Sequence, residues 1–258
     1  MDESALVLII GGIVFTTFAV EGIAGFGSTV MALPFVSMLI GVEKAVPMLS
    51  SMGLVLSLFI VCRSYRELDF REYGFIVLHA APGVAAGLFL MDFLSRNVLI
   101  AFLVCFIFFV GIRGMVCYFR ARERTPASGV KNPHTLPARG ILFLGGVIQG
   151  AFSSGGPVVV MYASRAIPEK SRFRAVLSSL WLTTNSIMAL KWTVAGNVWT
   201  PFLGRMILFL LPFIICGMVT GDFLHHKVDQ RKFTLLVCSV LIVAGCMLGA
   251  NLARSLLF

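Results

Sequence analysis

Long apolar segments separated by short polar stretches run along almost the whole chain. A helix needs about 20 apolar residues to cross a bilayer, or somewhat fewer when it is broken. Five such segments precede residue 120 and five follow residue 139. They cover residues 4–20, 29–40, 45–62, 73–91, 97–119, 140–152, 157–166, 175–191, 202–221 and 233–253. The pattern predicts an all-α integral membrane protein.

The stretch between the two groups of segments, residues 120–139, is polar. It contains Thr125-Pro126, Ser128-Gly129 and Asn132-Pro133, and this density of turn formers is typical of a linker. We therefore divide the chain into a first transmembrane repeat (1–119), a linker (120–139) and a second transmembrane repeat (140–258).

The two groups of segments resemble each other in sequence. Glu21-Gly22 corresponds to Gln149-Gly150, and at nearly the same offset along the chain Asp92-Phe93-Leu94 corresponds to Asp222-Phe223-Leu224. Five crossings per half is an odd number, so the second half must be inverted relative to the first. The parity stays odd if the short first pair of each half is a re-entrant hairpin instead. We therefore predict two inverted-topology repeats, each with broken or re-entrant short helices.

The lysines and arginines indicate how this bundle is oriented, because cytoplasmic loops carry an excess of them. With the N-terminus outside and ten crossings, fifteen of the 21 lie in inside loops and five in outside loops. This count predicts a cytoplasmic linker. The net charge of +9 therefore indicates sidedness rather than nucleic-acid binding, since 13% charged residues cannot cover a soluble domain that is 58% hydrophobic.

Two glycine- and serine-rich interruptions, residues 21–29 and 149–157, occupy matching positions in the two halves. Such matched breaks are the best sequence indicator of the substrate site in a transporter with inverted repeats. Glycine lets the backbone turn tightly, serine and threonine cap the next helix, and helix N-termini attract anions. The alternative is a pair of tight loops between close-packed helices. The expected substrate-binding residues in the breaks are Gly25, Gly27, Ser28, Thr29, Ser153, Ser154, Gly155 and Gly156.

Three further polar residues are candidates for function. Glu21 adjoins the first break, and an intramembrane carboxylate is by default a functional group. We hypothesise that Glu21 couples transport to protons and is protonated when an anion binds, with the neutral Gln149 as its counterpart. The alternative is a solvated glutamate at a helix end. Asn185 lies in a mid-span polar run, residues 183–186, and either lines the pathway or holds two helices together.

Small-residue pairs are expected to let helices approach closely. They are Gly83-x-x-x-Gly87, Gly217-x-x-x-Gly221 and Gly245-x-x-x-Gly249.

The duplicated glycine-rich segment, the spacing of the repeats and the hydrophobic profile resemble the sulfite exporter TauE/SafE family of anion permeases. Gly155-Gly156-Pro157 is close to the family pattern, whereas Gly25-Phe26-Gly27-Ser28 stands where a longer glycine run is usual. The resemblance covers nearly the whole chain. It implies transport of small sulfur-containing anions such as sulfite, sulfonates or sulfoacetate across a bacterial inner membrane, coupled to an ion gradient.

The leading hypothesis is thus a secondary transporter of a small anion, with a proton or sodium as coupling ion. No Walker-type nucleotide-binding motif occurs in the sequence, and no cofactor is expected. A membrane-embedded enzyme is disfavoured because the four histidines are scattered. An anion channel, or a carrier of another small carboxylate, stays open as an alternative. The expected surroundings are the lipid bilayer, with no nucleic-acid partner, and the oligomeric state, a homodimer included, stays open.

Overall fold

The computed structural model describes residues 3–24, 26–121, 134–195, 198–224 and 230–257. These residues form ten α-helices, one 3-10 turn (η1, Tyr65–Glu67) and no strand. The α-helices of the first half are α1 (Glu3–Ala24), α2 (Ser28–Ile40), α3 (Val42–Ser64), α4 (Phe70–Phe93) and α5 (Arg96–Ala121). Those of the second half are α6 (Leu136–Phe152), α7 (Gly156–Ala166), α8 (Lys170–Ala195), α9 (Pro201–Leu224) and α10 (Gln230–Leu257).

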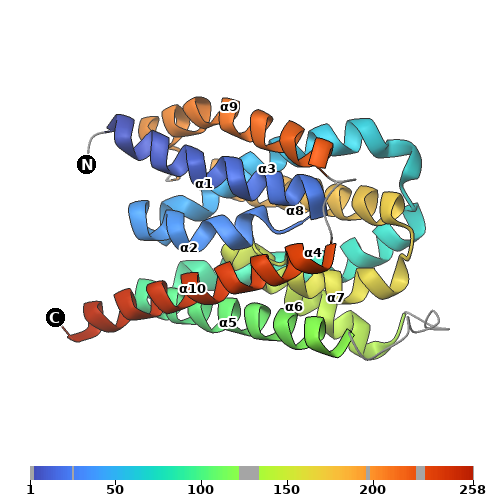
Figure 1. The fold of residues 1–258 in the computed structure, drawn as a ribbon. Coiled ribbons are helices and arrows are strands. Elements are labelled where there is room, and N and C mark those ends of the chain that lie inside the picture. Colours follow the sequence, from blue (N-terminus) through green and yellow to red (C-terminus); the bar gives the residue numbers. More distant parts are fainter. Residues whose placement is uncertain (1–2, 25, 122–133, 196–197, 225–229, 258) are drawn as a thin grey trace.

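Each apolar segment that the sequence predicts lies within one of these helices, and the all-α fold is confirmed. In the described part of the chain, five helices are long and apolar enough to cross a membrane, namely α1, α3, α4, α5 and α9. Figure 1 shows the helices as a bundle, with the two termini at one end and the C-terminal end of α5 at the other.

The helices are longer than the apolar segments, so the connections between them are shorter than predicted. α5 continues to Ala121 and α6 begins at Leu136, which places both ends of the predicted linker inside helices. The breaks are also shorter than predicted, because α1 continues to Ala24 and α6 to Phe152. Of the residues expected in the breaks, Gly25 lies outside the described residues.

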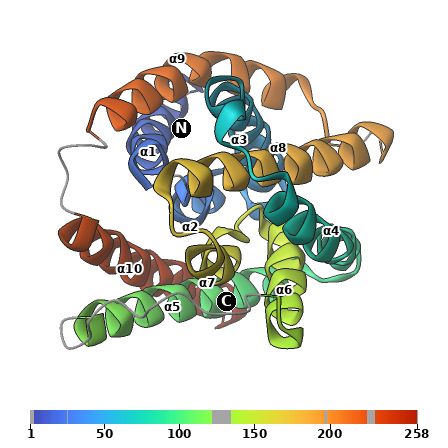
Figure 2. The ribbon, with the colours of Figure 1, turned by 90° about the vertical axis from the view of Figure 1, so that its right-hand side faces the viewer.

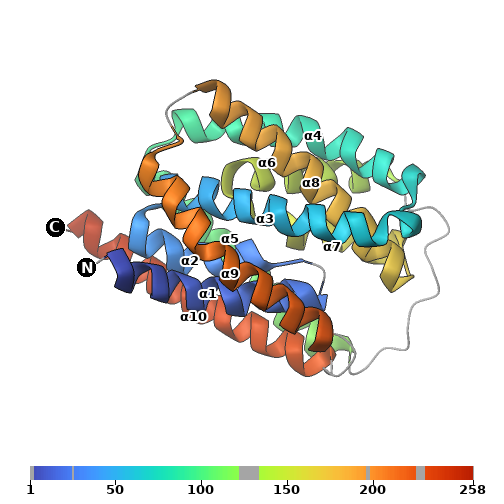
Figure 3. The same ribbon diagram turned by 90° about the horizontal axis from the view of Figure 1, so that it is seen from above.

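Helices of the first half pack mainly against helices of the second half. α1 packs against α9 and α4 packs against α6, while α3 pairs with α8 and α5 with α10. If each helix is replaced by its counterpart in the other half (α1 by α6, α4 by α9), the α1·α9 pair becomes the α4·α6 pair. The same replacement leaves the α3·α8 and α5·α10 pairs as they are. α1 and α6 also run in opposite directions along the bundle (Figures 1 and 3). Both features are what inverted repeats require, and the repeat itself stays a prediction that they support.

Two of these pairs are held backbone to backbone by glycine. A Cβ atom at Gly83 or Gly87 of α4 would overlap the carbonyl oxygen of Phe143 or Val147 of α6. On the other side of the bundle, a Cβ atom at Gly217 or Gly221 of α9 would overlap a carbonyl oxygen of α1. The predicted close approach at these two glycine pairs is therefore confirmed. Gly245 and Gly249 of α10 meet only side chains of α5.

Seen along the bundle, the α1·α9 and α4·α6 pairs lie on different sides of α3 and α8 (Figure 2). The short helices α2 and α7 lie near the middle in the same view. The two helix breaks therefore face the interior of the bundle, where irregular backbone is tolerated if protein or a wet cavity satisfies it.

Candidate functional site

A polar cavity lies where the two helix breaks meet α3 and α8. It has a volume of about 30 Å³, counted as the space open to the centre of a water molecule, which is room for about two waters. The described residues that line it are Glu21, Gly27, Thr29, Val30, Gly53, Ser57, Gln149, Ser153, Ser154, Gly156, Trp181 and Asn185. Most residues expected from the sequence are thus brought together, from both halves of the chain.

Glu21 and Gln149 make equivalent contacts across the two breaks. The N–H of Ser28, the first residue of α2, donates a hydrogen bond to Glu21 Oε2 at 3.1 Å. The N–H of Gly155, which precedes α7, donates to Gln149 Oε1 at 2.9 Å. In each half a side chain from the end of one helix therefore caps the start of the next. Both residues are buried, so the alternative of a solvated glutamate does not describe Glu21.

The prediction that serine and threonine hydroxyls cap α2 and α7 is wrong. The cap positions are Gly27, in a left-handed conformation, and Gly155, and neither helix has a side-chain cap from its own N-terminal residues. Ser28 is already the first residue of α2, and its hydroxyl donates back to Glu21 Oε2. The hydroxyl of Ser154 donates to the carbonyl of Phe152 at 2.9 Å.

Asn185 of α8 is the centre of a buried hydrogen-bond network beside the cavity. Its Oδ1 accepts hydrogen bonds from Gln149 Nε2 at 2.9 Å, from Ser50 Oγ at 3.2 Å and from Ser153 Oγ at 3.4 Å. The network ties α3, α6 and the second break to α8. Because the oxygen is fully used, the amide nitrogen Nδ2 is oriented away from these donors and lies beside Gly53, a residue of the cavity wall.

The other polar residues around Asn185 do not reach the cavity. Thr184 and Ser186 donate to the carbonyl oxygens of Leu180 and Leu182 within the helix, and Ser186 is exposed on the outside of the bundle. Thr183 donates to the carbonyl of Ser179 and contacts the hydroxyl of Tyr73. Asn185 therefore both lines the cavity and joins helices, whereas its neighbours back-bond to the helix.

Sequence reasoning missed Ser57, Gly53 and Trp181 in the cavity wall. Ser57 could have been found, because the offset that aligns Glu21 with Gln149 also aligns Ser57 with Asn185. Gly53 is needed where it lies, since a Cβ atom there would come within 3.1 Å of Asn185 Nδ2.

The cavity wall carries several neutral groups that can donate hydrogen bonds. Among its described residues, Glu21 is the only one with a formal charge. The structure gives the hydroxyls of Ser57 and Thr29 no acceptor within the described part of the protein. At the start of α7, Pro157 has no N–H and Val158 donates to Gly155, so the N–H of Gly156 is the group there that stays without an acceptor among the described residues. Neutral donors and helix N-termini together favour an anion as the occupant.

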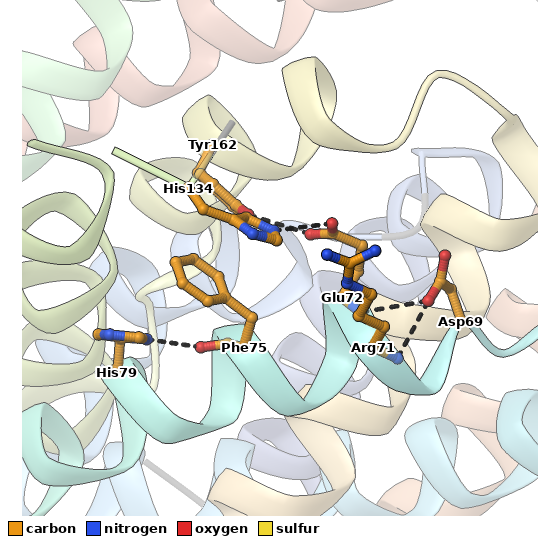
Figure 4. A network of polar contacts seen from close by, with 7 residues as sticks. All are labelled: Asp69, Arg71, Glu72, Phe75, His79, His134 and Tyr162. Atoms are coloured by element: carbon orange, nitrogen blue, oxygen red, sulfur yellow. Dashed lines mark hydrogen bonds and ion pairs between the residues drawn. The ribbon is translucent and has the colours of Figure 1, made fainter. Parts of the chain in front are cut away.

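A second polar cluster lies outside the cavity, at the start of α4 (Figure 4). The carboxylate of Glu72 accepts a hydrogen bond from the hydroxyl of Tyr162 of α7 at 3.0 Å and contacts His134 Nε2 at 2.9 Å. The His134 ring stacks on Phe75 at a centroid distance of 4.1 Å. This cluster joins α7, and the segment that leads into α6, to α4. In the described part of the chain, no three His, Cys, Asp or Glu side chains are grouped to hold a metal ion.

A membrane-embedded helical bundle in which two helix breaks enclose one buried polar cavity is the architecture of a membrane transporter. The chain belongs to the sulfite exporter TauE/SafE family, whose sequence model matches residues 8–248. The family membership expected from the sequence is thereby confirmed, and it places the chain with transporters rather than enzymes.

A comparison with known proteins gives a relative whose name is also that of a transporter. The chain is 25% identical over 197 residues to the probable inner membrane transporter protein TsaS of Comamonas testosteroni, and the match covers 74% of this chain and 77% of that protein. No solved structure matches the chain.

Proposed function

We propose that this protein is a secondary transporter that moves small sulfur-containing anions, such as sulfite, sulfonates or sulfoacetate, across the inner membrane. The family description and the name of the relative support the class of substrate and the membrane. The observation that carries the proposal is the polar cavity at the two breaks, whose wall includes the hydroxyls of Ser57 and Thr29 and the amide of Asn185.

The two ends of the cavity differ in charge, and this difference favours one of them for the anion. The start of α2 is capped by the carboxylate of Glu21, whereas the start of α7 is capped by the neutral amide of Gln149. An ionised Glu21 repels an anion and already neutralises the positive end of α2. In this proposal the anion therefore binds near the start of α7, within reach of Asn185 Nδ2 and Ser57 Oγ.

The same comparison supports proton coupling. Gln149 caps with its oxygen and donates with its nitrogen to Asn185. A protonated Glu21 has the same two functions, because Oε2 can keep its bonds to Ser28 while a proton on Oε1 becomes a donor. In the described residues Oε1 has no hydrogen-bond donor of its own. Protonation thus turns a repelling group into a further ligand for the anion, and anion and proton move together.

The variant Glu21→Gln tests this coupling without removing the cap. Because the amide oxygen of Gln149 caps α7 in the equivalent place, the variant is expected to fold and to bind the anion. Its uptake should lose the dependence on an inward proton gradient, while Glu21→Ala should lose the cap as well and melt at a lower temperature. Uptake by Glu21→Gln that keeps the full pH response of the wild type would refute a coupling role for Glu21.

The substrate class is tested with purified protein in proteoliposomes. The panel consists of labelled sulfite, sulfoacetate, taurine, acetate and chloride, each offered with and without a proton gradient. We expect saturable, gradient-driven uptake of the sulfur anions. Saturable uptake of acetate alone would favour a carboxylate carrier, and uncoupled flux that follows only the anion's own gradient would favour a channel.

The orientation and the assembly are part of the proposal. The count of lysines and arginines in the loops puts the N-terminus outside and the central linker in the cytoplasm. The proposed assembly is a monomer or a homodimer in the lipid bilayer.

A further inference from the structure

Two ion pairs join helices of different halves of the chain. Lys191 Nζ of α8 lies 2.6 Å from Asp92 Oδ2 of α4 and donates to the carbonyl of Leu88 at 3.0 Å. Arg63 of α3 lies 3.9 Å from Asp222 of α9. The first pair thus connects α8 with α4, and the second connects α3 with α9.

The two ion pairs are counterparts in the repeat. Lys191 is the counterpart of Arg63 at the offset that aligns the helix breaks, and Asp222 is the counterpart of Asp92 in the Asp-Phe-Leu motifs. Exchanging the halves therefore converts one ion pair into the other. Since α4 and α9 run in opposite directions (Figure 3), the two pairs lie at opposite ends of the bundle. The Arg63–Asp222 pair is at the end where α5 leads to α6.

Each ion pair connects one of the two helix pairs that are packed through glycine (α1·α9 and α4·α6) to one of the central helices. Arg63 belongs to α3 and Lys191 belongs to α8. Asp222 belongs to the α1·α9 pair, which carries the first break, and Asp92 belongs to the α4·α6 pair, which carries the second. In each pair, the glycines let the two helix backbones touch. If one helix slid along the other, a larger side chain would meet the partner backbone and overlap it, so each pair moves as one unit. The contacts of Glu72 with Tyr162 and His134 add α7 to the α4·α6 pair.

We propose that Arg63–Asp222 and Lys191–Asp92 are alternating latches at opposite ends of the pathway, each holding one glycine-packed helix pair against α3 and α8. This proposal rests on the transport function proposed above. Opening the Lys191 latch lets α4·α6 move away and exposes the cavity at one end. Opening the latch at Asp222, which contacts Arg63 of α3 and Arg174 of α8, lets α1·α9 move and exposes the cavity at the other end.

The geometry of the latches suits repeated opening. All four side chains are at least partly exposed, from 32% for Lys191 to 71% for Arg63, and exposed ion pairs are weak enough to break in each cycle. The latches are also unequal in this structure, because the contact between the halves is short at Lys191 and long at Arg63. Asp222 also pairs with Arg174 of α8 at 2.9 Å, so the latch at this end holds α9 to both α3 and α8. The counterpart of Arg174 in the first half is Val46, and the other latch has no second cation at that position.

The test measures from which side the cavity can be reached, in the absence of any substrate. A cysteine is placed in the cavity wall as Ser57→Cys, in a protein whose native cysteines are replaced by alanine, and is labelled with a charged, membrane-impermeant thiol reagent. The labelling rate is compared between right-side-out and inside-out membrane vesicles. The replaced cysteines are Cys62, Cys105, Cys117, Cys216, Cys238 and Cys246.

We expect Asp92→Asn to raise the labelling rate about two- to fivefold from one side, in line with the strength of exposed ion pairs. Asp222→Asn should raise it from the opposite side, because it weakens the contacts of α9 with both Arg63 of α3 and Arg174 of α8. The exchange of charges in Asp92→Lys with Lys191→Asp should restore the original rate. The matched control is Glu169→Gln. It breaks the ion pair with Arg172 at the start of α8, which joins no two helices, and it should not change the labelling rate from either side.

Faster labelling from the same side in both variants, or no change in either, would overturn the latches. Anion uptake by the unmodified protein with unchanged labelling in the variants would leave the transport function standing and remove the latches. Opposite-sided labelling without uptake of any panel anion would support the latches and remove the proposed substrate.

Discussion

Replacement of Asn185 by aspartate is expected to lower anion uptake about a hundredfold at subsaturating substrate. A second carboxylate oxygen takes the place of the Nδ2 donor beside Gly53, while the first keeps the hydrogen bonds from Gln149, Ser50 and Ser153. The network is thus preserved and only the group toward the cavity changes. Like charges brought together in a binding site cost several kcal/mol, and about 3 kcal/mol corresponds to roughly a hundredfold in binding.

The measurement is initial uptake in proteoliposomes, normalised to the amount of folded protein found by size-exclusion chromatography. Ser186→Ala is the matched control, because Ser186 is the next residue on α8 but is exposed on the outside of the bundle and bonded to Leu182. Its uptake should equal that of the wild type. Uptake by Asn185→Asp within about threefold of the wild type would show that Asn185 does not face the substrate.

Gly87→Ala is expected to be among the most destabilising small substitutions in the described part of the bundle. The added Cβ atom would overlap the carbonyl oxygen of Val147 and crowd the N–H of Ala151, so α4 and α6 must move apart along their length. Overpacking of this kind is unfavourable by about 1–3 kcal/mol. We therefore expect the melting temperature in detergent to fall by about 5–10 °C.

Gly74→Ala is the matched control on the same helix. A Cβ atom at Gly74 meets nothing within 4 Å, so the substitution should leave the melting temperature unchanged or raise it slightly, since alanine favours the helix. Equal melting temperatures for Gly87→Ala and Gly74→Ala would contradict the backbone packing of α4 on α6 and, with it, the treatment of these helices as one moving body.

The sequence was sufficient for the membrane-spanning helices because their signal is local. An apolar run of this length has one stable arrangement in a bilayer, a helix that satisfies its own backbone groups. The glycine pairs of α4 and α9 were likewise readable, since small residues four apart present a flat helix face. The helix ends were less predictable, and α6 begins before its apolar segment, at Leu136.

Only part of the candidate site could be predicted from the sequence. Glycine and serine in matched positions predicted where both helix breaks lie, and with them most of the cavity wall. The roles within the breaks were not readable from local sequence. A serine beside a helix start normally caps it, yet here Glu21 and Gln149 reach across the breaks and do so.

What the sequence determined by itself is therefore the class of fold, the family and the position of the two breaks. The tertiary structure decided which groups meet at those breaks. The convergence of Gln149, Ser50 and Ser153 on Asn185, and of Lys191 on Asp92, joins residues that are far apart along the chain. Contacts over such distances depend on how helices pack against each other, and no local preference of the chain encodes them.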